Sequence, residues 1–200
     1  MAWLWAHFLR PLVRPLGFIG RGFLDMFLLR SSWCDHIGNT TLAFLTALVI
    51  NLISVPISAW FYWQSAQDMG FSYEGQLLIE AVMLVAILLL VYLMALCRLR
   101  VQQFPVIYAG ITYSGLMIAL ILLVVEGGLS VYDASLYGQS VPMLAHALLL
   151  AALLWMLLLT SFVFKTALKI GAAASVMMTA MLFFVAISGR YILGMIGLYF

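Results

Sequence analysis

The apolar residues of this chain fall into five long runs separated by short polar segments. Each run has about 20 residues or more, which a helix needs to cross a hydrocarbon core of about 30 Å. None alternates apolar and polar residues as a barrel strand does, so helices are expected to satisfy the backbone hydrogen bonds within the bilayer. The predicted spans are Thr40–Trp63, Leu77–Cys97, Pro105–Val125, Val141–Phe164 and Ala172–Leu198.

A shorter apolar segment, Leu16–Leu29, precedes the first span and holds Arg21 and Asp25 one helical turn apart. We expect an amphipathic helix lying flat at the membrane interface, within a cytoplasmic or interfacial segment 1–39. The alternative is a sixth, re-entrant or spanning segment, against which the two charges and three glycines argue. The predicted fold class is therefore all-α. Residues 1–200 are expected to form a single transmembrane domain, a polytopic five-helix bundle behind an interfacial helix.

Composition agrees with this pattern. Hydrophobic residues make up 66% of the chain and charged residues only 8%, whereas soluble domains carry about 25% charged residues. This number of charged residues is too small to cover the surface of a soluble globule. The chain must therefore be surrounded by lipid. The net charge of +2 and the scattered basic residues give no patch for nucleic acid.

The basic residues predict the orientation in the membrane. The positive-inside rule places loops rich in Lys and Arg in the cytoplasm. Three segments carry basic residues: the one before the first span, the one after the second and the one after the fourth. This arrangement predicts a cytoplasmic N-terminus and a C-terminus outside. Eight of the nine basic residues fall on the predicted cytoplasmic side: Arg10, Arg14, Arg21, Arg30, Arg98, Arg100, Lys165 and Lys169.

The ionisable residues within the predicted spans form the candidate site, because charged groups in lipid are costly and usually mark a function. They are Glu80, His146 and Arg190, each within one or two turns of the outer end of its span. At 1.5 Å rise per residue, their depths agree to within roughly 8 Å. A polar cluster there would bind a lipid head group or an ion, or relay a proton. Two other interpretations are an Arg190–Glu80 ion pair joining two helices, and an Arg190 side chain that reaches the outer head groups.

A second polar position lies near the middle of the first span. Asn51 stands five residues before Pro56. An Asn at that depth usually forms hydrogen bonds between helices, and a proline frees a backbone carbonyl and can kink the span. Asn51 and Pro56 are therefore a possible hinge, with plain structural packing as the favoured interpretation.

Signatures of an enzyme or a metal site are absent from the sequence. It contains no HExxH, GxSxG, Walker or dinucleotide-binding motif. Ser161 and His146 lie at opposite ends of one predicted span, so they cannot form a nucleophile–base pair. Cys34 and Cys97 are far apart and match no metal-ligand spacing, so each is expected to pack as a small apolar residue. We expect no enzymatic activity, no cofactor and no metal.

Residues Phe104–Leu182 resemble the Yip-domain family of five-span membrane proteins. FPVIYAGITYSGLMIALILLVVEG is similar to the third span of that family, in which an aromatic-rich opening follows a basic loop. LLLAALLWMLLLTSFVFKTALKIGAAASVMMTAML is similar to the fourth and fifth spans, joined by a short basic turn. The proline that often breaks the family's third span is missing, and Ser114-Gly115 stands there instead. The resemblance implies a role in membrane organisation and, with so short an N-terminus, a bacterial inner-membrane protein.

Two functions fit these observations. The first is a non-enzymatic scaffold or a subunit of a larger membrane complex, whose partners are the lipid bilayer and other membrane proteins. The second is a small transporter, channel or lipid-handling protein that uses the polar cluster in the outer half of the bundle. The sequence leaves the oligomeric state open.

Overall fold

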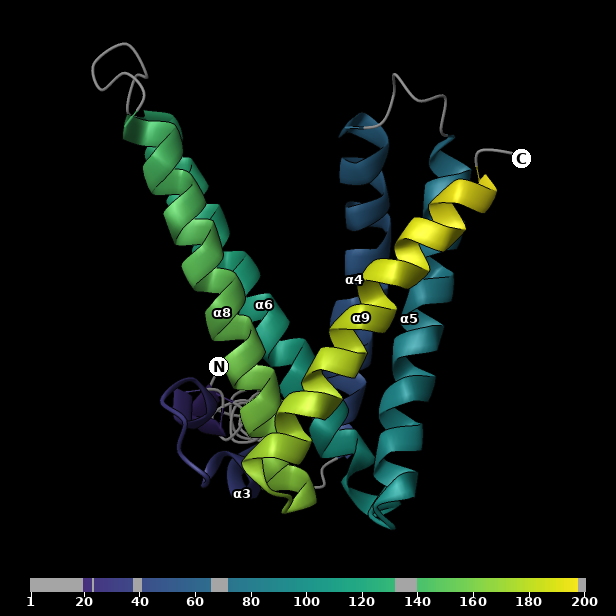
Figure 1. Cartoon of the computed structure of the whole chain (residues 1–200), viewed down its shortest axis with the longest axis vertical. Helices are drawn as coiled ribbons and strands as arrows, with labels where there is room; N and C mark the ends of the chain where they lie inside the picture. Colours follow the sequence, from purple (N-terminus) through teal and green to yellow (C-terminus); the bar gives the residue numbers. More distant parts are fainter. Residues whose placement is uncertain (1–19, 23, 38–40, 66–71, 132–139, 198–200) are drawn as a thin grey trace, which may run out of the picture.

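The computed structural model describes residues 20–22, 24–37, 41–65, 72–131 and 140–197. Within these ranges the chain is helical between its turns and has no strands, as predicted (Figure 1). Five of the helices are long and apolar enough to cross a membrane. The elements are α3 (Trp33–Ile37), α4 (Thr41–Ser65), α5 (Tyr73–Cys97), the 3₁₀ helix η3 (Val101–Gln103), α6 (Phe104–Val131), α8 (Ser140–Leu168) and α9 (Ala172–Gly197).

The five predicted spans are confirmed, but α5, α6 and α8 extend by several residues beyond their apolar runs, and α8 continues past Phe164 to Leu168. Helix α5 begins four residues before Leu77, because the Ser72 hydroxyl accepts a hydrogen bond from Gly75 N at 3.0 Å and caps the first turn. Helix α6 continues six residues past Val125 to Val131. A helix does not have to end where the hydrocarbon ends, so apolar runs mark membrane depth better than they mark helix ends.

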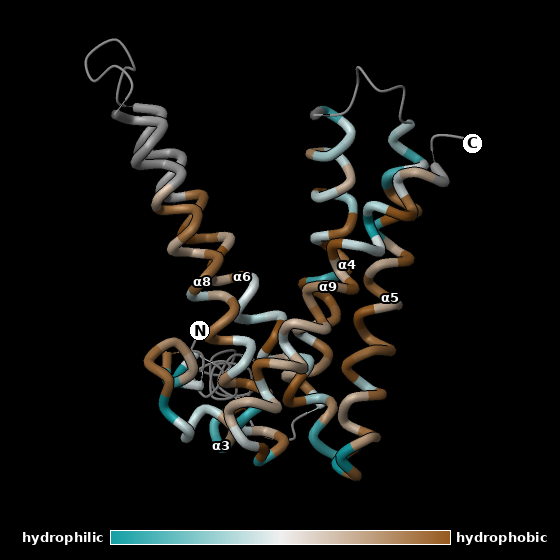
Figure 2. The backbone as a smooth tube through the Cα atoms, in the orientation of Figure 1, coloured by the Kyte–Doolittle hydropathy of each residue, from teal (hydrophilic) through white to brown (hydrophobic). Residues whose placement is uncertain are grey.

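The helices pack as a ring in the order α4, α5, α9, α8 and α6, with α6 back against α4. Helix α6 is the most enclosed, since half of its most apolar stretch is buried, against 17–28% for the other four. Figure 1 shows α6 and α8 as a pair that diverges from α4, α5 and α9 away from the end that holds α3. Apolar residues dominate the spans, and hydrophilic ones gather at the turn between α5 and α6 (Figure 2).

The segment before α4 packs against the bundle. Residues 20–22 and 24–27 are helical, and α3 follows after a turn. The Phe27 ring contacts the Trp155 ring edge-on at 5.7 Å between centroids. Trp33 is fully buried, and its Nε1 donates to Thr166 Oγ1 at 2.9 Å. Thr166 and Trp155 are separated by about 16 Å along α8, so this segment lies along the side of the bundle as well as at its end. Residues 16–19 of the predicted interfacial helix lie outside the described ranges.

The three turns at the α3 end close in the same way. Leu29, Leu99 and Lys169 have φ angles of 54°, 53° and 52°, the left-handed region that usually ends a helix at glycine. In each turn the next residue donates a backbone hydrogen bond to the carbonyl five residues earlier in the chain. These bonds run from Arg30 to Asp25 (2.7 Å), from Arg100 to Ala95 (2.9 Å) and from Ile170 to Lys165 (3.2 Å). The motif sharply reverses the chain and puts basic residues at its tips.

Gly110 on α6 allows α3 to dock, and this can be tested. A Cβ at Gly110 would lie 3.0 Å from both Trp33 Cη2 and Val163 Cγ1, whereas a Cβ at Gly115 would meet nothing within 4 Å. We expect Gly110→Ala to lower the free energy of unfolding by about 1–3 kcal/mol through overpacking. Gly115→Ala on the same helix should be neutral or stabilising by up to about 1 kcal/mol. Thermal unfolding in a mild detergent measures both; equal tolerance of the two variants would show that α3 is not wedged against α6.

Candidate functional site

Glu80 and Arg190 form an ion pair between α5 and α9. Arg190 Nη2 lies 2.8 Å from Glu80 Oε2, the pairing that was one of the three interpretations of these residues. The two side chains differ in environment: that of Glu80 is 7% exposed and that of Arg190 is 43% exposed. The carboxylate therefore depends on its partner much more than the guanidinium does.

Tyr62 on α4 is the third member of this site. Its hydroxyl accepts a hydrogen bond from Arg190 Nη1 at 2.8 Å, and the guanidinium carbon lies 4.9 Å from the centroid of its ring. Tyr62 stands at the end of the first predicted span, where aromatic residues commonly line the membrane interface, and it was not part of the candidate site predicted from sequence. The available signal was its depth, which matches that of Glu80, but an interfacial tyrosine is too common to indicate a partner. We call Tyr62, Glu80 and Arg190 the polar clamp, which joins α4, α5 and α9.

A close approach of two helices brings the clamp together. A Cβ at Gly189 would lie 2.8 Å from Met83 Sδ, and Met83 is buried on α5 one turn after Glu80. Small residues at such contacts let helix backbones approach each other in membranes. Gly189 thus sets the distance between α9 and α5 at the position next to Arg190.

His146, the other predicted member, lies on α8, and its side chain is outside the described residues. No group of three or more His, Cys, Asp or Glu in the described part of the chain can hold a metal ion. As a pair, Glu80 and Arg190 are neutral overall, which lowers the cost of charge in the membrane. The polar clamp therefore holds three helices together, and it leaves one partly exposed cation, Arg190, at its edge.

A second polar joint connects α4 to α6. Asn51 Nδ2 lies 2.8 Å from Tyr108 Oη and 2.7 Å from Thr112 Oγ1, and it also donates to Ala47 O at 3.1 Å within its own helix. The structure thus supplies the inter-helix partners expected of an Asn at that depth. Helix α4 runs without interruption through Pro56, and a hinge at this position stays a prediction.

Further hydroxyl groups join neighbouring helices in the same way. Thr46 Oγ1 on α4 lies 2.9 Å from Tyr113 Oη on α6, and Tyr113 Oη donates to Ala43 O at 3.1 Å. Ser161 on α8 and Ser175 on α9 lie 3.0 Å apart, oxygen to oxygen. These joints were not predicted from sequence, because an apolar run shows how deep a hydroxyl lies but not which helix it faces.

The described bundle also contains three buried polar atoms without a hydrogen-bond partner, Trp155 Nε1, Thr160 Oγ1 and Thr179 Oγ1. All three belong to α8 or α9. Leaving such a group unpaired costs roughly 1–3 kcal/mol. Helices α8 and α9 therefore carry the unpaired polar atoms of the described bundle, whereas Asn51 and Tyr113 between α4 and α6 have hydrogen-bond partners.

Cys34 on α3 is not a reactive thiol. Burial raises its pKa to about 11, an effect that the hydrogen bond to Thr166 only partly offsets. The thiolate is the reactive form of cysteine, so this group is inert at neutral pH. This supports the expectation that Cys34 is a packing residue.

The unequal burial of the ion pair predicts unequal effects of mutation. Arg190→Ala strands the buried Glu80 carboxylate and should cost about 3 kcal/mol of folding free energy. Glu80→Gln leaves a cation that is already 43% exposed and should cost about 1 kcal/mol. The Glu80→Gln/Arg190→Ala double variant should lose less than the sum of the single losses, because it strands no charge. Thermal unfolding of all three in one detergent measures the coupling, and strictly additive losses would argue against the pair.

Comparisons with protein-family models, with curated proteins and with solved structures give no match. The five apolar helices make the chain a multi-pass membrane protein.

Proposed function

We propose that this protein is a non-enzymatic scaffold, or a subunit of a larger membrane complex. One observation carries the proposal: the charged pair inside the spans is held in a bond between helices, with Arg190 joined to both Glu80 and Tyr62. A catalytic or transport group needs to meet its substrate, whereas these groups meet one another. Asn51 and Tyr113 are likewise engaged between helices.

The outward surface of α9 supports the same proposal. Four large side chains on this helix are each more than two-thirds exposed, and they offer an apolar face to lipid or to the helices of a partner. They are Met177, Phe184, Ile187 and Tyr191. A subunit of a membrane complex needs a stable fold and an exposed lateral surface that its partners can cover. Helices in membranes pack against one another through such surfaces.

The Yip-domain resemblance is part of this proposal. Five spans are what that family implies, and a role in organising membranes is consistent with a scaffold. We place the protein in a bacterial inner membrane with its N-terminus in the cytoplasm. This orientation is supported by the basic turns at the α3 end, which carry Arg98, Arg100, Lys165 and Lys169.

The scaffold proposal predicts a discrete hetero-complex. The full chain, tagged and extracted from its native membrane in a mild detergent, should elute with other membrane proteins in fixed stoichiometry. Size-exclusion chromatography with light scattering and mass spectrometry of the same peak measures this. An unrelated five-span protein with the same tag is the control for non-specific recovery. A clean monomer that retains no other protein would contradict the proposal.

A second candidate function is a small transporter, channel or lipid-handling protein. The observation that favours it is the 43% exposure of the Arg190 side chain. The cation at the edge of the polar clamp is accessible to a lipid head group or an anion, although it is bonded to Glu80. This proposal gives the polar clamp a role beyond stability.

The two functions can be separated by measuring the activity of variants per amount of folded protein. If the polar clamp handles a substrate, Glu80→Gln and Arg190→Ala should each abolish tracer-anion flux or fluorescent-lipid transfer in vesicles, at equal amounts of folded protein. Asn51→Ala is the control, because it removes an uncharged inter-helix joint elsewhere in the bundle. If the activity of all three variants falls only as far as their amount of folded protein falls, the transport proposal is ruled out.

A further inference from the structure

Two adjacent depressions lie at the α3 end of the bundle. One has a volume of about 650 Å³ and is lined by the turn from Leu96 to Gln103. The other, about 420 Å³, lies between α3, the start of α6 and the end of α8, and Lys169 is part of its lining. Gln103 lines both of them, so the two depressions adjoin at this residue, and we refer to them together as the groove.

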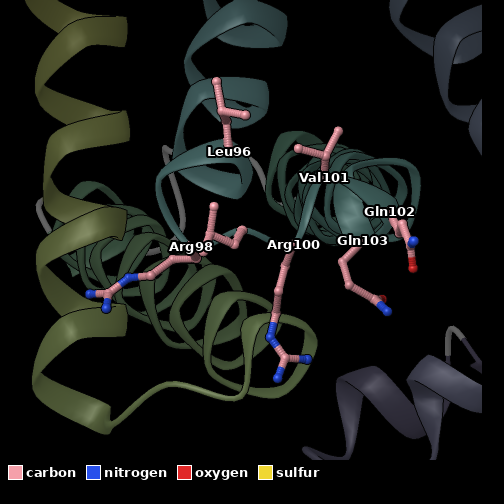
Figure 3. A pocket seen from close by; sticks show the side chains of 7 residues that line it. Leu96, Arg98, Arg100, Val101, Gln102 and Gln103 are labelled. Carbon is pink, nitrogen blue, oxygen red and sulfur yellow. The ribbon is translucent and has the colours of Figure 1, made fainter.

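The lining of this groove is predominantly cationic. Arg98, Arg100 and Lys169 contribute three positive charges, and Asp35 is the only acidic residue among those that line it. Figure 3 shows Arg100 and Gln103 extending from the same side of the turn, while Arg98 extends away from them. Gln103 also lines the depression that contains Lys169.

These cations lack protein counter-ions within the described ranges. No carboxylate there lies within 4.0 Å of Arg98, Arg100 or Lys169, in contrast to Arg190, which is paired with Glu80. The positive-inside rule accounts for basic residues on this side, but it does not require a hollow between them. Unpaired cations that line a hollow are a feature of anion sites.

We propose that this groove binds a phosphate group, with Arg100 and Lys169 as the charged ligands and the Gln103 amide as a neutral donor. The planar guanidinium of arginine matches the oxygens of a phosphate, and a lysine adds a compact charge. The source is either the head group of an anionic phospholipid or free phosphate, since both present the same oxygens. The apolar side chains of Leu96 and Val101 in the same lining suit a lipid.

The experiment uses the full chain in a neutral detergent. Native mass spectrometry and calorimetry measure the binding of short-chain phosphatidylglycerol, phosphatidylcholine and inorganic phosphate. We expect phosphatidylglycerol to bind about tenfold more tightly than phosphatidylcholine. Arg100→Gln and Lys169→Gln should each weaken that binding about tenfold, the usual size of one charge-assisted hydrogen bond. Unchanged melting temperatures show that both variants remain folded.

Lys165→Gln is the matched control, because Lys165 is an exposed cation at the same end that lines neither depression. Its affinity for phosphatidylglycerol should stay within about twofold of the wild-type value. Selective losses at Arg100 and Lys169 support the site. If those losses are seen and inorganic phosphate displaces phosphatidylglycerol at a similar affinity, the ligand is free phosphate. If inorganic phosphate does not displace phosphatidylglycerol, the ligand is the lipid head group. Equal losses in all three variants would indicate only diffuse charge and overturn the proposal. The absence of any preference for phosphatidylglycerol, together with no binding of inorganic phosphate, would also overturn it.

Discussion

In the hydrocarbon of a bilayer, a polar group finds no water, and each one left without a partner costs up to several kcal/mol. This constraint accounts for the helices, which satisfy their own backbones, and for the pairing of the polar side chains between them. The Glu80 carboxylate is tolerated at 7% exposure because Arg190 lies 2.8 Å away. Asn51 is tolerated because two hydroxyl groups of α6 are within hydrogen-bond distance.

The same constraint explains what could be predicted from sequence. The five spans were predictable because the length of an apolar run reflects the thickness of the bilayer directly. The Glu80–Arg190 pair was accessible through depth, since two charges at one level in lipid each need a partner. Tyr62 was missed as a partner, because its position at the end of a span is already explained by the interface. The docking of Trp33 against Gly110 depends on which helices are neighbours, and apolar periodicity does not specify that in a chain surrounded by lipid.

The stabilising contacts are distributed unevenly along the membrane normal. The polar clamp joins α4, α5 and α9 near the ends that lie away from α3 and does not include α6. The Asn51 and Tyr113 joints connect α4 to α6 in the middle of the bundle and toward its basic end. Trp33 adds a contact between α3 and α8 at that end. This distribution agrees with Figure 1, in which α6 and α8 diverge from the other three helices away from the α3 end.

At one end of the bundle a cation is paired with a carboxylate of the same chain, and at the other end the cations beside the groove are unpaired within the described residues. This difference bears on function. At the end away from α3, the Arg190 cation is neutralised by the Glu80 carboxylate of the same chain, so their interaction stabilises the fold. At the basic end Arg100 and Lys169 remain unpaired within the described ranges, beside an open groove. A charge paired within the chain can be removed only at a cost in stability, whereas a charge that faces a groove can be removed with little effect on folding. The Glu80–Arg190 pair therefore acts as a structural tie, whereas the anion site that we propose uses the cations beside the groove at the basic end.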